Sequence, residues 1–204
     1  MCDFSDMDTS IYLNQAEKFC PKKINFLFIA ESPPAFRGDA PVSYFYFVPN
    51  HGGDLLFASL INALTNYIYR NNPVLKESLL EDLQKNKKCF LMDAVKYPIN
   101  RNRNWEKIPN VQRKGIIRDN EENFFERLKS LEEMGYIYSK TRFILIKRTV
   151  YNTLYEPLKA HYNVLNEGHI GFPRYFEDPL FVDKIRNLIV SQAFDCFDKM
   201  NDNN

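Results

Sequence analysis

Glu31 is the first residue whose type and position could carry chemistry. It follows an apolar run, residues 24–30, and precedes Ser32, Pro33 and Pro34. Each proline fixes its own φ angle and restricts the residue before it, so this loop is stiff. A stiff loop can present one carboxylate and nearby backbone groups at a fixed place. The alternative is a structural carboxylate that caps a helix or pairs with a surface arginine.

Two further titratable side chains are candidates. Asp93 interrupts the apolar run of residues 89–95, and a buried unpaired carboxylate is costly, so we expect it where a ligand or partner can satisfy it. His169 lies between two glycines and before a proline. There an imidazole can donate to, or an imidazolium can stabilise, a developing anion. The plain alternatives are a carboxylate that accepts loop N–H groups and a polar surface histidine.

Four consecutive aromatic rings, Tyr44 to Phe47, follow in a loop rich in glycine and proline. We do not expect four successive rings to face one core. A flat aromatic platform is what a nucleobase stacks on, which makes Tyr44 and Tyr46 candidates for base binding. The alternative is a short edge strand with alternating buried rings.

Residues 96–118 form a predicted long loop with seven basic residues and one acidic residue. Tyr97 and Trp105 are interleaved with the basic side chains, a pattern that suits a phosphate backbone and stacked bases. The alternative is a solvated charged loop. The basic residues are Lys96, Arg101, Arg103, Lys107, Arg113, Lys114 and Arg118.

Composition limits the class of protein. The chain has 204 residues and a formal net charge of +1, which excludes a protein that coats nucleic acid by bulk charge. No apolar run approaches the roughly 18 residues of a membrane helix, and the acidic N-terminus has no hydrophobic signal core. We therefore expect a cytoplasmic protein. The four cysteines form no C-x-x-C pair, so we expect free thiols and neither a metal site nor a cofactor.

The elements that must position these residues alternate along the chain. Three apolar runs, 24–30, 89–95 and 142–146, are typical of strands buried on both faces, and residues 164–165 are a short fourth strand. We expect a single domain over residues 1–204, with an N-terminal extension at 1–23 that contains a short helix, and a polar tail at 201–204. Five helices are predicted in the main part of the chain. The first follows Asp54, the second covers 74–84, and the third extends from Asp119 to about Met134. The fourth covers 150–161 after the cap Thr149, and the fifth covers 180–200.

This order predicts an α/β fold, a three-layer α/β/α sandwich around a short central parallel sheet of four strands. Ligands of open parallel sheets bind beyond the carboxyl ends of the strands. The rule points to the loops at 31–53, 96–118 and 147–149 and to the loop after Leu165.

The order of these segments resembles the uracil-DNA glycosylase superfamily. Residues 29–34, Ile-Ala-Glu-Ser-Pro-Pro, resemble its first motif, and residues 90–98 resemble its middle strand with the following lysine- and proline-containing loop. Residues 169–173, His-Ile-Gly-Phe-Pro, occupy the place of its final motif. Three features differ: the iron–sulfur cysteines are missing, Asp93 stands where active members usually have asparagine, and the final motif lacks its serine.

The resemblance implies a hydrolase that cleaves the N-glycosidic bond of a modified base flipped out of DNA, single-stranded or damaged DNA included. In that role Glu31 and His169 would be catalytic. Base-binding residues would be Ser32, Pro33, Tyr44, Tyr46 and Asp93. Contacts to the nucleic-acid backbone would come from Lys96, Arg101, Arg103, Arg113, Lys114 and Arg174. An inactive nucleic-acid- or nucleotide-binding module, and an α/β scaffold with no nucleic-acid role, remain the alternatives.

Overall fold

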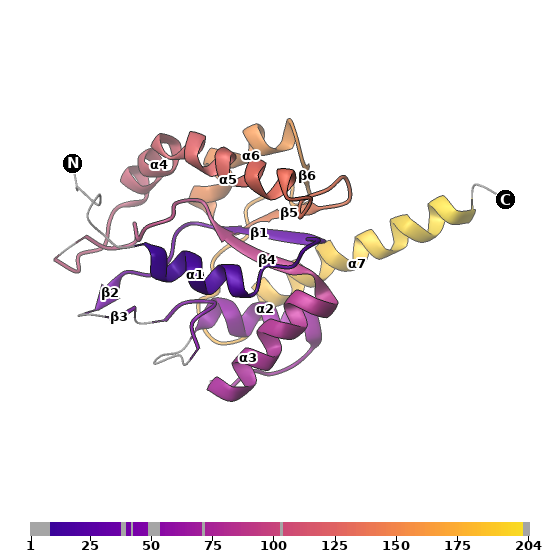
Figure 1. The fold of residues 1–204 in the computed structure, drawn as a ribbon, viewed down its shortest axis with the longest axis horizontal. Helices are drawn as coiled ribbons and strands as arrows, with labels where there is room; N and C mark the ends of the chain where they lie inside the picture. Colours follow the sequence, from indigo (N-terminus) through magenta and orange to yellow (C-terminus); the bar gives the residue numbers. More distant parts are fainter. Residues whose placement is uncertain are drawn as a thin grey trace.

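The computed structural model describes residues 9–37, 40–41, 43–48, 54–70, 72–102 and 104–201. Its centre is a four-stranded, all-parallel sheet in the order β4-β1-β5-β6 (Figure 1). The strands are β1 (Phe26–Ala30), β4 (Cys89–Asp93), β5 (Arg142–Leu145) and β6 (Asn163–Val164). A short antiparallel pair, β2 (Phe36–Arg37) and β3 (Ala40–Pro41), lies apart from this sheet.

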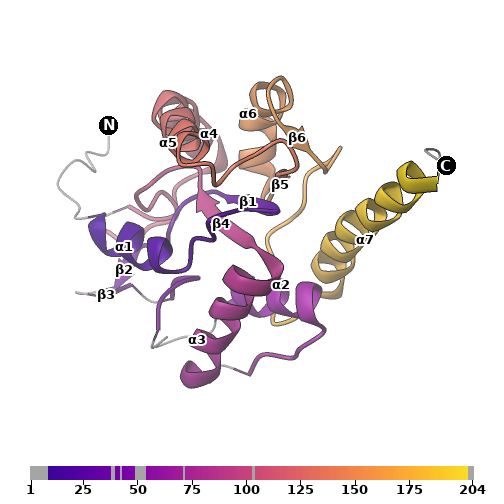
Figure 2. The ribbon, with the colours of Figure 1, turned by 45° about the vertical axis from the view of Figure 1, so that its right-hand side comes forward.

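Helices cover both faces of the sheet, which confirms the predicted α/β/α sandwich. Figures 1 and 2 show α4, α5 and α6 on one face and α2 and α3 on the other, with α7 packed against α2. The bounds are α1 (Ser10–Lys18), α2 (Leu55–Thr65), α3 (Pro73–Asp82), the π-helical turn η1 (Leu83–Lys87), α4 (Asn110–Asp119), α5 (Glu121–Glu133), α6 (Arg148–Lys159) and α7 (Pro179–Asn201).

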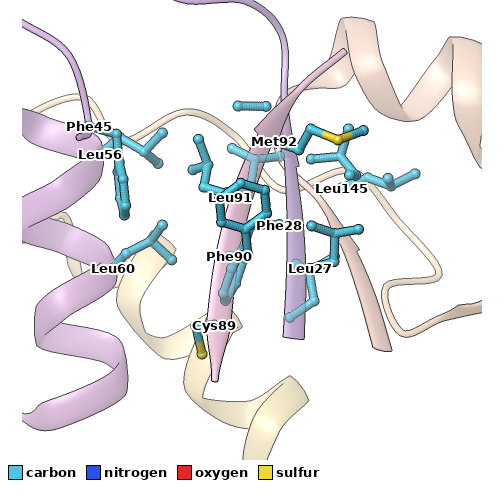
Figure 3. Packing of buried hydrophobic residues seen from close by; sticks show 14 of the residues in the cluster. Leu27, Phe28, Phe45, Leu56, Leu60, Cys89, Phe90, Leu91, Met92 and Leu145 are labelled. Carbon is cyan, nitrogen blue, oxygen red and sulfur yellow. The ribbon is translucent and has the colours of Figure 1, made fainter. Parts of the chain in front are cut away.

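The strands are apolar along their whole length because both faces of the sheet are covered. Leu27 and Ile29 of β1 and Ile144 of β5 are fully buried. Figure 3 shows Leu91 of β4 packed toward α2, where Leu56 and Leu60 meet it. Burial on both faces therefore explains why the sequence has continuous rather than alternating apolar runs here.

The chain order creates a switch point at the middle of the sheet. From β1 the chain passes through α2 and α3 to β4 at one edge, and then through α4 and α5 to β5 on the other side of β1. The register pairs Ala30 with Asp93 and Ile29 with Leu145. Because the strands are parallel, the residues that follow β1, β4 and β5 meet at the same edge of the sheet.

Three local predictions were wrong. Residues 110–119 form α4, so only the first part of the predicted 96–118 loop is irregular. Thr149 is not the cap of α6, because Lys147 takes that position with a φ of 83°. Tyr44, Phe45 and Tyr46 are all buried in the main core, because a turn lets successive rings point to different sides.

Candidate functional site

A cavity of about 210 Å³ lies at the carboxyl edge of the sheet, at the ends of β1, β4 and β5. Glu31 enters it from β1, Asp93 from β4 and Lys147 from the residues after β5. Tyr44 and Phe172 contribute aromatic wall. The cavity occupies the position where open parallel sheets bind their ligands.

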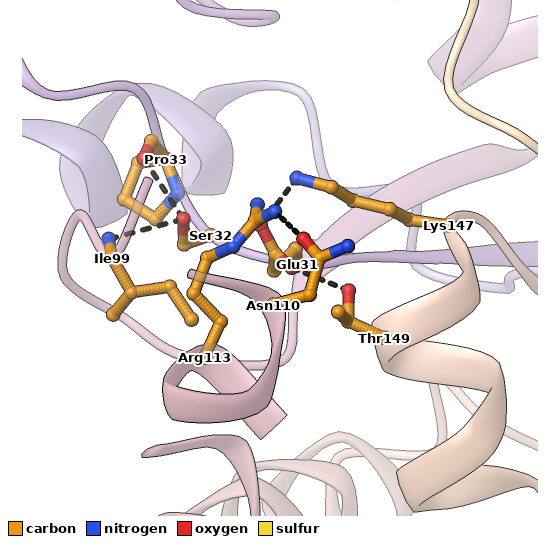
Figure 4. A network of polar contacts seen from close by, with 8 residues as sticks. All are labelled: Glu31, Ser32, Pro33, Ile99, Asn110, Arg113, Lys147 and Thr149. Carbon is orange, nitrogen blue, oxygen red and sulfur yellow. Dashed lines mark hydrogen bonds and ion pairs between the residues drawn. The ribbon is translucent and has the colours of Figure 1, made fainter. Parts of the chain in front are cut away.

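Glu31 is the most heavily bonded side chain of the site (Figure 4). Its carboxylate is 3% exposed and accepts from Arg113 Nη1 at 2.6 Å, from Lys147 Nζ and from the Thr149 hydroxyl. The Asn110 side-chain oxygen accepts a hydrogen bond from Nη2 of the same guanidinium. Two cations on one buried carboxylate leave a local charge of +1 beneath the cavity.

The backbone conformation of Lys147, with a positive φ, places its side chain next to Glu31. Its positive φ turns the chain sharply between β5 and α6, and its N–H donates to the Ile170 carbonyl at 2.7 Å. Its side chain remains 26% exposed and lines the cavity. Burial lowers the pKa of the Lys147 ammonium from its ordinary value, and the Glu31 carboxylate partly offsets that effect. A non-glycine residue held in this conformation is typical of functional sites.

Asp93 is the open carboxyl group of the cavity. Burial raises its pKa to about 7, nearby Arg127 opposes the rise, and the Glu31 carboxylate adds to it. Within the described part of the chain no hydrogen bond or ion pair is made by this side chain. Near neutral pH it therefore exists in both protonation states, which is the condition for proton transfer.

The loop after Glu31 is locked onto the segment that follows β4. The Ser32 hydroxyl accepts from Ile99 N at 3.3 Å and donates to the Pro33 carbonyl at 3.2 Å. Tyr44 packs edge-on against Tyr12, and its hydroxyl donates to the Tyr12 carbonyl. These contacts make one wall of the cavity rigid.

The structure brings together five of the residues selected from the sequence: the cavity is lined by Glu31, Ser32, Pro33, Tyr44 and Asp93. Two others lie elsewhere. Tyr46 is in the core, where its hydroxyl bonds the backbone of Leu91. His169 is exposed and does not line the cavity, although its loop pairs with the end of β5 through Ile170 and sends Phe172 to the cavity wall.

The basic residues predicted to contact a nucleic-acid backbone lie in different environments. Arg113 is buried on Glu31 and is not available to a surface ligand. Arg101 donates to the Trp105 carbonyl at 2.6 Å and lies over its ring, and Arg174 pairs with Asp178. Lys96 is exposed and Lys114 partly exposed, whereas Arg103 lies outside the described residues.

Sequence reasoning missed Lys147, Thr149 and Phe172 as parts of the site. For Lys147 and Thr149 the sequence did carry a signal, because the loop at 147–149 follows a buried strand and was expected at the ligand-binding edge of the sheet. The ion pair of Arg113 with Glu31 was not predicted either, because the two residues are 82 positions apart and no local pattern links them.

Among the described residues, no group of three or more His, Cys, Asp or Glu side chains is placed to hold a metal ion. Cys20 and Cys89 are free cysteines. In the same part of the chain, every helix is too short or too polar to cross a membrane.

Fold and site together define an α/β protein with a small, mainly apolar cavity that holds a few charged groups at the carboxyl edge of a parallel sheet. Comparison with protein-family models, with curated proteins and with solved structures finds no match. Any function must therefore be argued from the site itself.

Proposed function

We propose that the protein is a DNA glycosylase-like hydrolase that cleaves the N-glycosidic bond of a modified base flipped out of DNA. The observation that carries this proposal is the pair Asp93 and Lys147, an open carboxyl group and an ammonium that face one cavity with aromatic walls. The cavity suits one flat heterocycle better than an extended ligand. Aromatic walls with a few polar groups are how flipped bases are held.

The groups of the cavity suit each part of the reaction. Water bonds to the sugar carbon as the carbon–nitrogen bond breaks, and the base leaves with the bonding electrons. Protonated Asp93 gives its proton to the departing base, and the attacking water returns one to Asp93. Lys147 stabilises the negative charge that develops on the base. Since three donors already hold Glu31, its part is to position Lys147 and Arg113 rather than to activate water.

Asp93 also bears on base selection. An ionised carboxylate only accepts hydrogen bonds, whereas a protonated carboxyl group also donates one. With its pKa raised to about 7, Asp93 can face either a carbonyl or an amino edge of a base near neutral pH. A test panel must therefore include both uracil and hypoxanthine in oligonucleotides.

The test measures abasic product from this panel with wild-type protein and with Lys147→Met. Wild type should release at least one base, and the variant should be slower by roughly 10²- to 10³-fold, as for the loss of one anion-stabilising group. Asp183→Asn, on an exposed position of α7, is the control and should keep full activity. Absence of abasic product on every substrate would remove the enzymatic proposal.

The second candidate is a non-catalytic base- or nucleotide-binding module. It is favoured by the full engagement of Glu31, which leaves the cavity with groups for binding but fewer for water activation. This module would bind oligonucleotides in a salt-dependent way without turnover. Asp93→Asn should then change base preference in equilibrium binding, while turnover by this variant at any rate would exclude the module.

A further inference from the structure

A second cavity of about 210 Å³ opens on the outer side of β4, between α1 and α5. It adjoins the candidate site, and the two cavities share four lining residues, Pro33, Tyr44, Leu91 and Asp93. Its walls are mainly apolar, and Leu13 and Met134 expose 38% and 54% of their surface at its rim. Exposed apolar side chains around an apolar hollow indicate a ligand rather than ordinary surface.

The charged residues that line this cavity are Glu17, Asp93, Lys96 and Arg127, and the hydrogen-bond donors of Arg127 are only partly satisfied. Arg127 of α5 donates from Nη2 to the Ala94 carbonyl at 2.8 Å, and its Nε is buried without a partner. Within the described residues, Nη1 makes no hydrogen bond either. Lys96 lines the same cavity and is exposed. A guanidinium with most of its donors free is a ready site for a carboxylate.

We infer that this second cavity binds a small apolar carboxylate, with its hydrocarbon part between α1 and α5 and its carboxylate on Arg127. The free donors of Arg127 select the anion over a neutral or cationic ligand of the same shape. The cavity volume limits the hydrocarbon part to a short chain or a single ring. This inference does not depend on the proposed hydrolysis, because it rests on Arg127, which lines the second cavity and not the candidate site.

Two acidic groups that line this cavity, exposed Glu17 and partly buried Asp93, could oppose an anion there. Burial raises the pKa of Asp93 to about 7, so it is mostly protonated at pH 6 and can then donate to a bound carboxylate. Binding should accordingly be stronger at pH 6 than at pH 8. The titratable and charged groups that interact with Asp93 are Glu31, Lys147, Arg127, Tyr12, Tyr44 and Tyr46.

The test is titration of the full chain with octanoate at pH 6, followed by calorimetry and by amide chemical shifts. Octanoate should bind and shift residues of α1, β4 and α5, while octanol and acetate should bind at least tenfold more weakly. Arg127→Met should weaken octanoate about ten- to hundredfold, as expected for a lost charge-assisted hydrogen bond. Equal binding of octanol and octanoate, or unchanged binding by Arg127→Met, would overturn the inference.

Two further variants keep the test decisive. Ala16→Phe fills the cavity from α1 without touching the charged end, so it should abolish octanoate binding even if Arg127→Met folds poorly. Phe172→Ala changes a wall of the candidate site alone and should leave octanoate affinity unchanged. Loss of binding with Phe172→Ala and not with Ala16→Phe would place the ligand in the other cavity and refute the assignment.

Discussion

Arg113 and Glu31, 82 residues apart, form a buried ion pair with 2.6 Å between Nη1 and Oε2. Their side chains are 6% and 3% exposed. Lys147 reaches the same carboxylate from the other side. One acidic group thus holds together the ends of β1 and β5 and the start of α4.

Glu31→Gln should therefore destabilise the protein strongly. The substitution leaves two cations next to a neutral amide, and breaking a buried pair in this way costs about 3–5 kcal/mol. Urea unfolding at pH 7 measures the loss. Glu81→Gln breaks the exposed pair with Lys85 and is the matched control, with an expected loss below about 0.5 kcal/mol. Equal losses for both variants would contradict the structural role of Glu31.

Asp93 should make stability depend on pH in a defined direction. Its folded pKa, about 7, lies above the ordinary value of 3.8, so the folded state holds a proton that the unfolded state has released. The free energy of unfolding should therefore decrease from about pH 4 to about pH 7 by on the order of 2–4 kcal/mol on account of this group, since one pKa unit is worth about 1.4 kcal/mol.

Asp93→Asn removes that decrease. The variant should be more stable than wild type at pH 8 and about equal to it at pH 4, and urea unfolding across this range gives the difference. Asp183→Asn should track wild type at every pH. A difference between Asp93→Asn and wild type that does not change with pH would show that Asp93 is not perturbed by burial.

Tyr46 stabilises the free edge of the sheet rather than a ligand. Its hydroxyl accepts from Leu91 N at 2.7 Å and donates to the Leu91 carbonyl at 3.0 Å. Tyr46→Phe leaves both backbone groups unpaired and should cost about 1–3 kcal/mol. Hydrogen exchange at the Leu91 amide should accelerate. Tyr44→Phe, which loses only a 3.4 Å bond, is the control and should cost less.

The basic residues should divide into two groups in DNA-binding experiments. Lys96→Gln and Lys114→Gln remove charge from the surface, so each should weaken binding and lower the salt slope by roughly 0.7–0.9 if it contacts one phosphate. Arg113→Gln should instead lower stability. Lys129→Gln, at a 74% exposed position of α5, is the control. A salt slope unchanged by the double variant of Lys96 and Lys114 would remove these two residues from the nucleic-acid interface.

Local patterns predicted much of the framework correctly. A helix was expected to follow Asp54, and the Asp54 carboxylate accepts from Phe57 N at 3.0 Å at the start of α2. Fully buried Lys76 also pairs with Asp54. No local pattern predicted this pair, because Lys76 lies 22 residues away and is placed there by α3. Helix α4 was missed since its composition is basic and its apolar positions are few.

The sequence by itself determined the strands, the parallel sheet and the edge at which the candidate site lies, because continuous apolar runs separated by helical segments are visible in neighbouring residues. Only the tertiary structure decided which side chains meet there. It places Arg113 and Lys147 on Glu31, leaves Asp93 open to two cavities, and turns His169 and Tyr46 away from the first. Ion pairs between distant segments depend on how helices pack on the sheet, and no spacing along the chain encodes that packing.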